Sequence, residues 1–476
     1  MGKEPYHDWE IKHDLLKKSI DGFQYWNYMR RDMTMSFRDE YADTEPAFYQ
    51  SMKEQASEGI FEKIKRGLQI LTPDLNPAIS KSDVVFICHS RRQEIDGKMV
   101  SIYTDYVADH FPGAVTLQRS GLGKYGRDRI YTENLIFLDK LSIKGYIYRY
   151  LRKFFTPAYY KKVRETIKGE MAEPFRDLSE NFDLHPDPDE FADRAAILYF
   201  IYKYKYPRYK RLLKKLSPKV IVEVVGLSTD AKIINELSRE MGIETVELQH
   251  GTGAITFWYP DNAPMPQFPK WYFTFGDFWK DCMKPPIPRD HIIPAGFPYH
   301  DMMMKEYPRE RWEHDKNTII FLSSRKYGKD FSALAAELKR LKPELHVIFK
   351  LHPREYTDYK EKYTDLRDSG VEVVADNKTP LYGLFAKCSM QVGVESTAIY
   401  EGMGFNLTTY IWDIPKAVSM KPIVEKGYAR LVKDAQDLIL KIDSRDDDKA
   451  DYDLNAFWKE NSMENIVNGI RSIGAS

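Results

Sequence analysis

The chain has 476 residues, which is too long for one ordinary hydrophobic core and predicts two or three domains. Hydrophobic residues make up 43% of it, which excludes wholesale disorder, and its 71 basic and 71 acidic residues leave no net charge that would draw it to nucleic acid. Its three cysteines lie far apart, which excludes a disulfide framework and a structural zinc site. We expect no metal and no other cofactor.

The N-terminal sequence MGKEPYHDWEIKHDLLKK lacks the apolar stretch of a secretory signal. No run of ~18 apolar residues occurs, so we expect no membrane-spanning helix. The expected location is the cytoplasm, with the inner face of the membrane as an alternative.

Residues 1–80 are charged and aromatic with helical spacing in places, and we predict a helical N-terminal extension there. From Asp83 onward, short apolar runs alternate with amphipathic helical patterns. Such runs are typical of strands that are buried on both faces. We predict strands at 83–88, 219–225, 244–248, 270–275, 317–322, 346–351, 371–374 and 389–394.

Alternating strands and helices predict βαβ units and parallel sheets, and therefore an α/β fold of doubly wound domains with ligand sites at the carboxyl ends of the strands. The Pro-rich and charged texture near residues 284–310 indicates a linker. We therefore expect an N-terminal domain over 81–300, a C-terminal domain over 301–445 and a C-terminal helical segment over 446–476, with a helix near 464–473.

Two tracts are basic and aromatic, YIYRYLRKFF (146–155) and FIYKYKYPRYKRLLKK (200–215). One interpretation is a solvated helix face whose aromatic side chains pack inward. The other is contact with an anionic membrane surface or an anionic acceptor. Nucleic acid is the weaker third interpretation because the overall charge is balanced.

The segment ELQHGTG (247–253) ends an apolar strand with His250 and follows it with a glycine-rich turn. Histidine at this position can accept a proton near neutral pH. Gly251 and Thr252 continue the turn, and glycine permits close approach of a backbone to a ligand. A histidine held within a tight turn is the alternative.

Three further strand ends carry groups that suit a phosphate. FKLHPRE (349–355) ends its strand in His352 and Arg354, and arginine can bind phosphate with two parallel hydrogen bonds. VGVESTAIYEG (392–402) leads from a strand into a helix, whose N-terminus is an anion site. FLSSRKYG (321–328) places hydroxyls and cations after another strand. The candidate residues for binding the phosphate of a nucleotide-activated donor are His352, Arg354, Glu395, Ser396, Thr397, Ser323, Ser324 and Arg325.

Other polar positions are candidates for the acceptor site or for the cleft between the domains. SRRQEIDG (90–97) follows the first predicted strand, and GFPYHD (296–301) lies in the expected linker. These candidates are Arg91, Arg92, Asp96 and His300, together with Gly251 and Thr252. The chain lacks a Walker A motif, a GxGxxG after a strand, a DxD motif and a GxSxG elbow, which disfavours P-loop, dinucleotide-binding, metal-dependent transferase and hydrolase functions.

Taken together, LQHGTG, LHPRE and VESTAIYEG resemble motifs of GT-B-type surface polysaccharide transferases. The chain is similar to capsule polysaccharide synthesis proteins, to CDP-glycerol glycerophosphotransferases and to bacterial sialyl- and polysialyltransferases. The resemblance implies two Rossmann-like domains facing a cleft. It also implies that His250 is the base and that His352, Ser396 and Thr397 hold the donor phosphate.

The resemblance further implies an enzyme that moves a sugar from a nucleotide-sugar donor to a glycan or lipid-linked acceptor, without metal and with inversion. Three alternatives remain open. The first is a phosphotransferase that uses a CDP-polyol donor, the second is a nucleotide-sugar 2-epimerase, and the third is a non-catalytic scaffold of a polysaccharide assembly complex.

Overall fold

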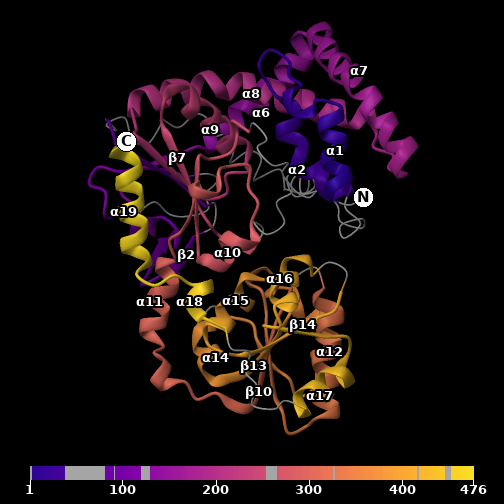
Figure 1. Ribbon diagram of the computed structural model, residues 1–476, viewed down its shortest axis with the longest axis vertical. Helices are drawn as coiled ribbons and strands as arrows, with labels where there is room; N and C mark the ends of the chain where they lie inside the picture. Colours follow the sequence, from indigo (N-terminus) through magenta and orange to yellow (C-terminus); the bar gives the residue numbers. More distant parts are fainter. Residues whose placement is uncertain are drawn as a thin grey trace.

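The computed structural model shows two α/β domains, one above the other in Figure 1. Each domain is built around one parallel sheet, and the carboxyl ends of the strands in each sheet lie toward the other domain. The structure describes residues 3–37, 81–89, 92–118, 129–252, 265–324, 327–376, 378–414, 417–444 and 452–475.

The first domain contains a seven-stranded sheet in the order β5-β4-β1-β6-β7-β8-β9. Every pair of neighbouring strands in it is parallel. The sheet grows outward in both directions from β1, so it is doubly wound, with a switch point between β1 and β6. The strands are β1 (Val84–Cys88), β4 (Val115–Gln118), β5 (Leu135–Phe137), β6 (Val220–Glu223), β7 (Glu244–Leu248), β8 (Trp271–Thr274) and β9 (Ile292–Pro294).

Helices bury both faces of this sheet, which explains why its strands are mostly apolar rather than alternating. In β1, Val85 and Ile87 join the core under the long helices, whereas Phe86 joins the core on the opposite face. The described helices of this domain are α5 (Asp105–Ala108), α6 (Asp139–Phe155), α7 (Pro157–Phe182), α8 (Pro188–Leu216), α9 (Thr229–Met241) and α10 (Asp277–Cys282). A hairpin of β2 (Gln93–Ile95) and β3 (Lys98–Val100) follows β1.

The described part of the expected N-terminal extension forms α1 (Lys3–Lys12) and α2 (Tyr25–Phe37). These helices pack into the first domain beside α7 and α8 (Figure 1). Trp9 is buried and its Nε1 donates to the carbonyl oxygen of Pro174 at 3.0 Å. The aromatic residues in the described part of this stretch are core residues: Tyr6, Trp9, Phe23, Tyr25, Trp26, Tyr28 and Phe37 are buried.

The second domain contains a six-stranded parallel sheet in the order β12-β11-β10-β13-β14-β15. This is again a doubly wound order, with its switch point between β10 and β13. The strands are β10 (Asp315–Leu322), β11 (His346–Lys350), β12 (Glu372–Val374), β13 (Cys388–Gly393), β14 (Thr408–Trp412) and β15 (Arg430–Val432). The described helices are α12 (Gly328–Leu341), α13 (Tyr359–Lys362), α14 (Leu381–Lys387), α15 (Thr397–Gly404), α16 (Lys421–Glu425) and α17 (Ala435–Asp443). The predicted GT-B-like α/β fold with two Rossmann-like domains is confirmed.

The segment expected to be a linker is more ordered than its composition indicates. Residues 284–310 contain β9, which is the edge strand of the first sheet, and α11 (Pro298–Glu306), which leads to the second domain. Pro294 can end this strand because an edge position leaves one side of the backbone unpaired.

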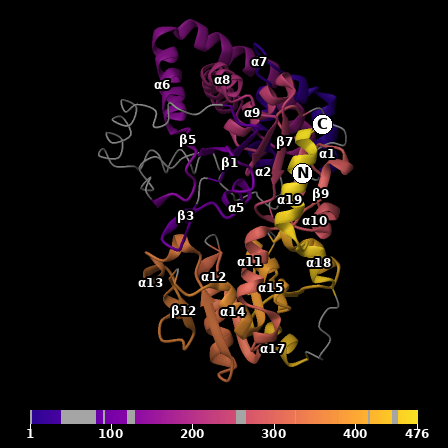
Figure 2. The same ribbon diagram turned by 90° about the vertical axis from the view of Figure 1, so that its left-hand side faces the viewer.

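The C-terminal segment returns to the first domain through α18 (Leu454–Phe457) and α19 (Ser462–Ala475). Figure 2 shows α19 lying along the first sheet. Ile466 and Ile470 join the core formed by Val222, Val246 and Phe273. The first domain is therefore completed by the last helix of the chain.

Aromatic side chains join the two domains at the point where the chain crosses between them. Trp279 of α10 lies 4.4 Å from Tyr400 of α15, measured between ring centroids, and Phe278 lies 4.7 Å from Phe457. Trp279 and Tyr400 are fully buried. The domains thus share one hydrophobic cluster on this side.

Candidate functional site

The carboxyl edges of the two sheets bring separate sequence motifs together at the boundary between the domains. His250 and Gly251 follow β7 of the first sheet, and Thr397 begins α15 after β13 of the second sheet. A Cβ atom placed on Gly251 would lie 3.2 Å from Thr397 Oγ1. We call residues 250–252 the HGT turn and residues 395–397 the EST turn. Gly251 and Thr397 are 146 residues apart in the chain, and the two turns are in contact.

His250 is partly exposed at this boundary and is held by groups of its own domain. Its main-chain carbonyl oxygen accepts a hydrogen bond from the Tyr103 hydroxyl at 3.0 Å, and its Nδ1 lies 3.9 Å from Oε1 of Glu247. The imidazole is 36% exposed, whereas Glu247 is 2% exposed. The ring is thus open to a ligand on one side and faces a buried carboxylate on the other.

His89, the residue after β1, lies beside His250. The two ring centroids are 5.9 Å apart, and the ring of Tyr103 lies 6.3 Å from His89. Two imidazoles and a phenol therefore gather at the carboxyl edge of the first sheet. The prediction from sequence missed His89 and Tyr103, although His89 shares with His250 the signal of a histidine directly after an apolar strand.

A pair of buried carboxylates lies beneath this group. Glu223 and Glu247 are register partners on β6 and β7, and both are buried. Gly226 makes room for them, since a Cβ atom there would lie 2.4 Å from Glu247 Oε2 and 2.6 Å from Glu223 Oε1. Asn235 Nδ2 donates to Glu223 Oε1 at 2.8 Å. Glutamate inside an otherwise apolar strand is unusual, and that signal could have identified Glu247.

The backbone after β6 adopts a strained conformation. Val225 has a φ of 73°, a region that a β-branched residue occupies only when its surroundings enforce it. Such strain costs on the order of 1–3 kcal/mol and concentrates at functional sites. It occurs here directly next to Gly226 and the carboxylate pair.

In the second domain, the HP turn follows β11. The main-chain N–H of His352 donates to Glu355 Oε2 at 2.9 Å, and Glu355 is buried and also accepts a hydrogen bond from the Tyr363 hydroxyl. Pro353 begins the short 3-10 helix that carries Glu355. This turn fixes the backbone of His352 and leaves its side chain partly exposed. The side chain of Arg354 lies outside the described residues.

The neighbouring strand ends carry the remaining predicted donor groups. Ser323 and Ser324 follow β10, between the ends of β11 and β13 in the sheet, and the main-chain N–H of Ser323 donates to the carbonyl oxygen of Lys350 at 3.0 Å. Glu395 and Ser396 follow β13 and are partly exposed. Ser396 caps α15, because its hydroxyl accepts from the Ala398 N–H at 3.2 Å. Arg325 lies outside the described residues.

Glu401 is a titratable group of α15 that the sequence prediction missed. It keeps part of its surface exposed, yet the surrounding protein raises its pKa to about 7 by desolvation, while a hydrogen bond from Tyr382 acts in the opposite direction. The pKa of Tyr299 is raised mainly by burial and, to a smaller extent, by the charge of Glu401. A carboxyl group that titrates near neutral pH therefore lies one turn along the helix from Thr397.

Two residues predicted to line the acceptor site or the cleft, Arg92 and His300, are buried inside the protein. The Arg92 side chain is fully buried, forms an ion pair with Asp105 at 2.5 Å and donates to Gln118 at 2.8 Å. His300 is buried against Trp458, with ring centroids 4.3 Å apart, and burial lowers its pKa to about 3. Both side chains are enclosed by protein, so the prediction that they line the cleft is wrong for this structure.

The other predicted acceptor residues differ in their placement. Asp96 is exposed at the turn of the β2–β3 hairpin with a φ of 48°. Arg91 lies outside the described residues. Thr252 is partly exposed at the end of the HGT turn. Asp96 and Thr252 stay predictions.

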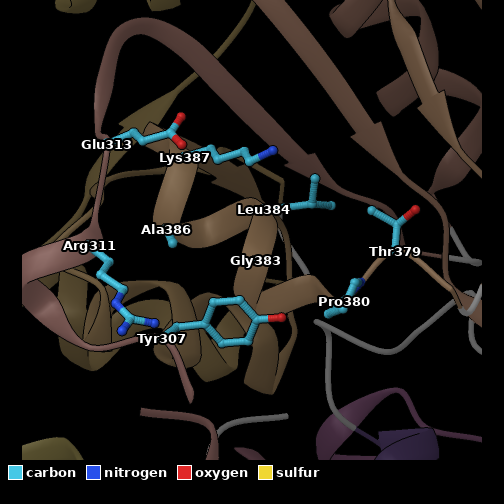
Figure 3. Close-up of a pocket in the computed structure, with 9 residues that line it drawn as sticks. All are labelled: Tyr307, Arg311, Glu313, Thr379, Pro380, Gly383, Leu384, Ala386 and Lys387. Carbon is cyan, nitrogen blue, oxygen red and sulfur yellow. The ribbon is translucent and has the colours of Figure 1, made fainter. Parts of the chain in front are cut away.

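A cavity of about 360 Å³ lies elsewhere, on the flank of the second domain beside α14. Figure 3 shows Tyr307 projecting across it, with Lys387 and Thr379 on other sides. Its lining residues are Tyr307, Arg311, Glu313, Thr379, Pro380, Gly383, Leu384, Ala386 and Lys387. None of these belongs to the HGT, HP or EST turns, so this cavity is separate from the candidate site.

Within the described ranges, no group of three or more histidine, cysteine, aspartate and glutamate side chains is placed to hold a metal ion. Among the same residues, no helix has the length and apolar character needed to cross a bilayer.

No protein-family model matches the chain, and no curated protein matches it. Solved structures similar to it include the wall teichoic acid polymerase TagF, at 10% identity over 90% of this chain and 97% of that chain, with a TM-score of 0.44. They also include UDP-GlcNAc 2-epimerases from Neisseria meningitidis, at 15% identity with a TM-score of 0.42, and from Methanocaldococcus jannaschii, at 14% identity with a TM-score of 0.41. Each epimerase match covers 58% of this chain and 82% of the other. At these identities the likeness concerns the fold alone.

Proposed function

We propose that the chain is a transferase that moves a sugar from a nucleotide-activated donor to a hydroxyl group of a glycan or lipid-linked acceptor, in the cytoplasmic synthesis of a cell-surface polysaccharide. The contact between Gly251 and Thr397 carries this proposal. It brings a histidine of one domain next to a helix N-terminus of the other, and transfer between two substrates needs a proton acceptor beside an anion site.

The donor phosphates are assigned to the carboxyl edge of the second sheet. There the N-terminus of α15 offers main-chain N–H groups and a favourable dipole, and the hydroxyl of Thr397 lies at the same position. His352 follows β11, which is two strands away from β13 and Thr397 in the sheet. Ser323 and Ser324 follow β10, the strand between β11 and β13. Donors fixed in place before the reaction stabilise the negative charge that develops on the departing nucleotide, without a metal ion.

The acceptor hydroxyl is assigned to the side of His250. Its oxygen attacks the anomeric carbon as the bond from that carbon to the phosphate oxygen breaks, and the nucleotide leaves with the electron pair. His250 takes up the hydroxyl proton, and the buried carboxylate of Glu247 stabilises the imidazolium that results. Direct displacement of this kind inverts the anomeric configuration.

The first experiment is a thermal-shift screen of the purified protein with CMP, CDP, UDP and GDP and with their sugar or polyol conjugates. A ligand that binds only the folded state raises the melting temperature by mass action, so we expect one nucleotide family to stabilise the protein. Incubation with the selected donor then separates the alternatives. Isomerised donor without acceptor identifies an epimerase, transferred polyol phosphate identifies a phosphotransferase, and binding to no nucleotide contradicts the proposal.

Two histidine variants test the assignment of roles. His250→Ala should lower kcat by roughly 10²–10⁴-fold while the donor Kd changes little, because a general base contributes that much to the rate. His352→Ala should weaken donor binding by about tenfold, since hydrogen bonds to charged groups contribute 1.5–3 kcal/mol. His346→Ala is the matched control, because His346 starts the same strand at the opposite edge and bonds to Glu372. Full activity in both test variants would show the assignment to be wrong.

A further inference from the structure

Helix α6 carries an exposed apolar stripe. Five residues at the spacing i, i+3, i+4, i+7 and i+8 lie on one side of it, which is the pattern of a helix face made to be buried. The described part of the chain nevertheless leaves them exposed. Their exposed fractions are 40% for Ile147, 61% for Tyr150, 48% for Leu151, 78% for Phe154 and 70% for Phe155.

The opposite face of α6 is already used by the fold. Gly145 approaches Lys205 of α8, where a Cβ atom would lie 3.4 Å from Lys205 Cε, and the rings of Tyr148 and Tyr204 are 5.3 Å apart. Arg152 turns back to Tyr148 through a hydrogen bond of 2.8 Å. The apolar stripe is therefore a second face of the helix, distinct from the one that holds it to the domain.

The surroundings of the stripe are strongly basic. Residues 140–163 contain seven lysines and arginines and no acidic residue, in a chain whose charges balance overall. Lys144, Lys153, Lys161 and Lys162 are exposed. An exposed apolar stripe flanked by cations matches a surface that offers both negative charge and hydrocarbon.

The second basic and aromatic tract, residues 200–215, is different. It lies within α8, and Phe200, Tyr202 and Tyr209 are buried in the core of the first domain. Lys205 is also buried and forms an ion pair with Asp230 at 2.6 Å. For this tract the structure agrees with the interpretation of inward-packing aromatics, and these buried side chains are not open to a membrane surface.

We propose that the exposed face of α6, with the corner where α6 meets α7, docks on an anionic lipid bilayer. An amphipathic helix of 17 residues, about 25 Å long, would lie in the interface with its apolar side among the acyl chains. A second copy of the chain is a poorer occupant, because it would bring the same four exposed lysines against each other. Figure 2 shows the corner at the end of the molecule opposite to the second domain, so docking leaves the domain boundary accessible.

The test is co-flotation of the full chain with vesicles of phosphatidylcholine alone and of phosphatidylcholine mixed with phosphatidylglycerol. We expect binding to the mixed vesicles that weakens as salt is raised. Phe154→Ser combined with Phe155→Ser should lower that binding by at least about tenfold, because two exposed aromatic rings no longer enter the bilayer. Lys161→Glu combined with Lys162→Glu should also lower it by about tenfold or more.

The matched control is Leu440→Ser, which removes an apolar side chain with 68% exposure from α17 of the second domain and should leave binding unchanged. All variants alter exposed side chains, so their melting temperatures and nucleotide binding should match the parent. Absent binding, equal binding to both vesicle types, or an equal loss in the control would overturn the proposal. A concentration-dependent dimer that the phenylalanine variant abolishes would also overturn it, in favour of a second copy.

Discussion

At the scale of single residues, the candidate site depends on polar groups that interrupt apolar strands. Glu247 is buried within a strand of the first sheet, and its Oε1 lies 3.9 Å from Nδ1 of the partly exposed His250. In the mechanism proposed above, a carboxylate in this position stabilises the positive charge that the histidine would acquire. It is a positioning residue for the proposed base.

Replacing Glu247 with glutamine tests this role. The amide keeps the shape of the side chain but carries no charge, so we expect kcat to fall by roughly 10–10²-fold with an unchanged donor Kd. The measurement is steady-state kinetics with the donor that the thermal-shift screen selects. The control is Glu244→Gln, which makes the same change at the start of the same strand. Gln249→Glu is less suitable, because the Gln249 side chain forms hydrogen bonds with the main chain of Gly251 and Phe275. Equal losses in both variants would assign Glu247 a purely structural role.

The carboxyl group of Glu401 predicts how stability depends on pH. Burial raises its pKa from an ordinary value near 4.5 to about 7. Between these two values the folded state keeps a proton that the unfolded state has lost, so stability decreases as pH rises from about 4.5 to 7. The loss should reach up to about 3 kcal/mol and should be absent in Glu401→Gln. Urea denaturation of both proteins across this pH range is the measurement, and parallel pH profiles would contradict the assignment.

At the scale of elements, all eight strands predicted from the sequence are present, because most of them are apolar runs buried between layers of helices. The strands that the prediction missed are mostly short. β4, β5, β9 and β15 have three or four residues each, too few for a pattern to stand out from a buried loop.

The HGT, HP and EST turns could be predicted because polar residues directly follow predicted strands. His89 and Glu247 carried a signal in the sequence, but the contacts that they and Glu401 make could not be predicted, because these depend on which strands and helices become neighbours.

The last helix illustrates how close packing fixes an element. Gly469 of α19 lies on the ring of Phe273, where a Cβ atom would come within 2.7 Å of the ring carbon Cζ. Gly469→Ala should therefore destabilise the protein by about 1–3 kcal/mol through overpacking. Gly169→Ala on α7 is the control, since no atom lies within 4 Å of the added carbon and alanine favours the helix by about 1 kcal/mol. Opposite signs are expected in urea denaturation, and destabilisation by both changes would contradict the packing argument.

At the scale of the whole molecule, two features hold the domains together. The aromatic cluster around Trp279 and Tyr400 joins them where the chain crosses, and the HGT and EST turns meet at the carboxyl edges of both sheets. Sequence reasoning predicted two facing domains but not this shared cluster, because Trp279 and Tyr400 belong to segments far apart in the chain. The mode of contact between domains depends on shape, which no local pattern encodes.

The return of α19 to the first sheet has a consequence for how the chain is made. The apolar face that Val222, Val246 and Phe273 present to this helix is synthesised well before residues 462–475 leave the ribosome. Until then that face has no cover from its own helix, and the second domain must be produced in the interval. Folding of the first domain can therefore be completed only after residues 462–475 have been made, so the nascent chain exposes an apolar surface that chaperones are suited to protect.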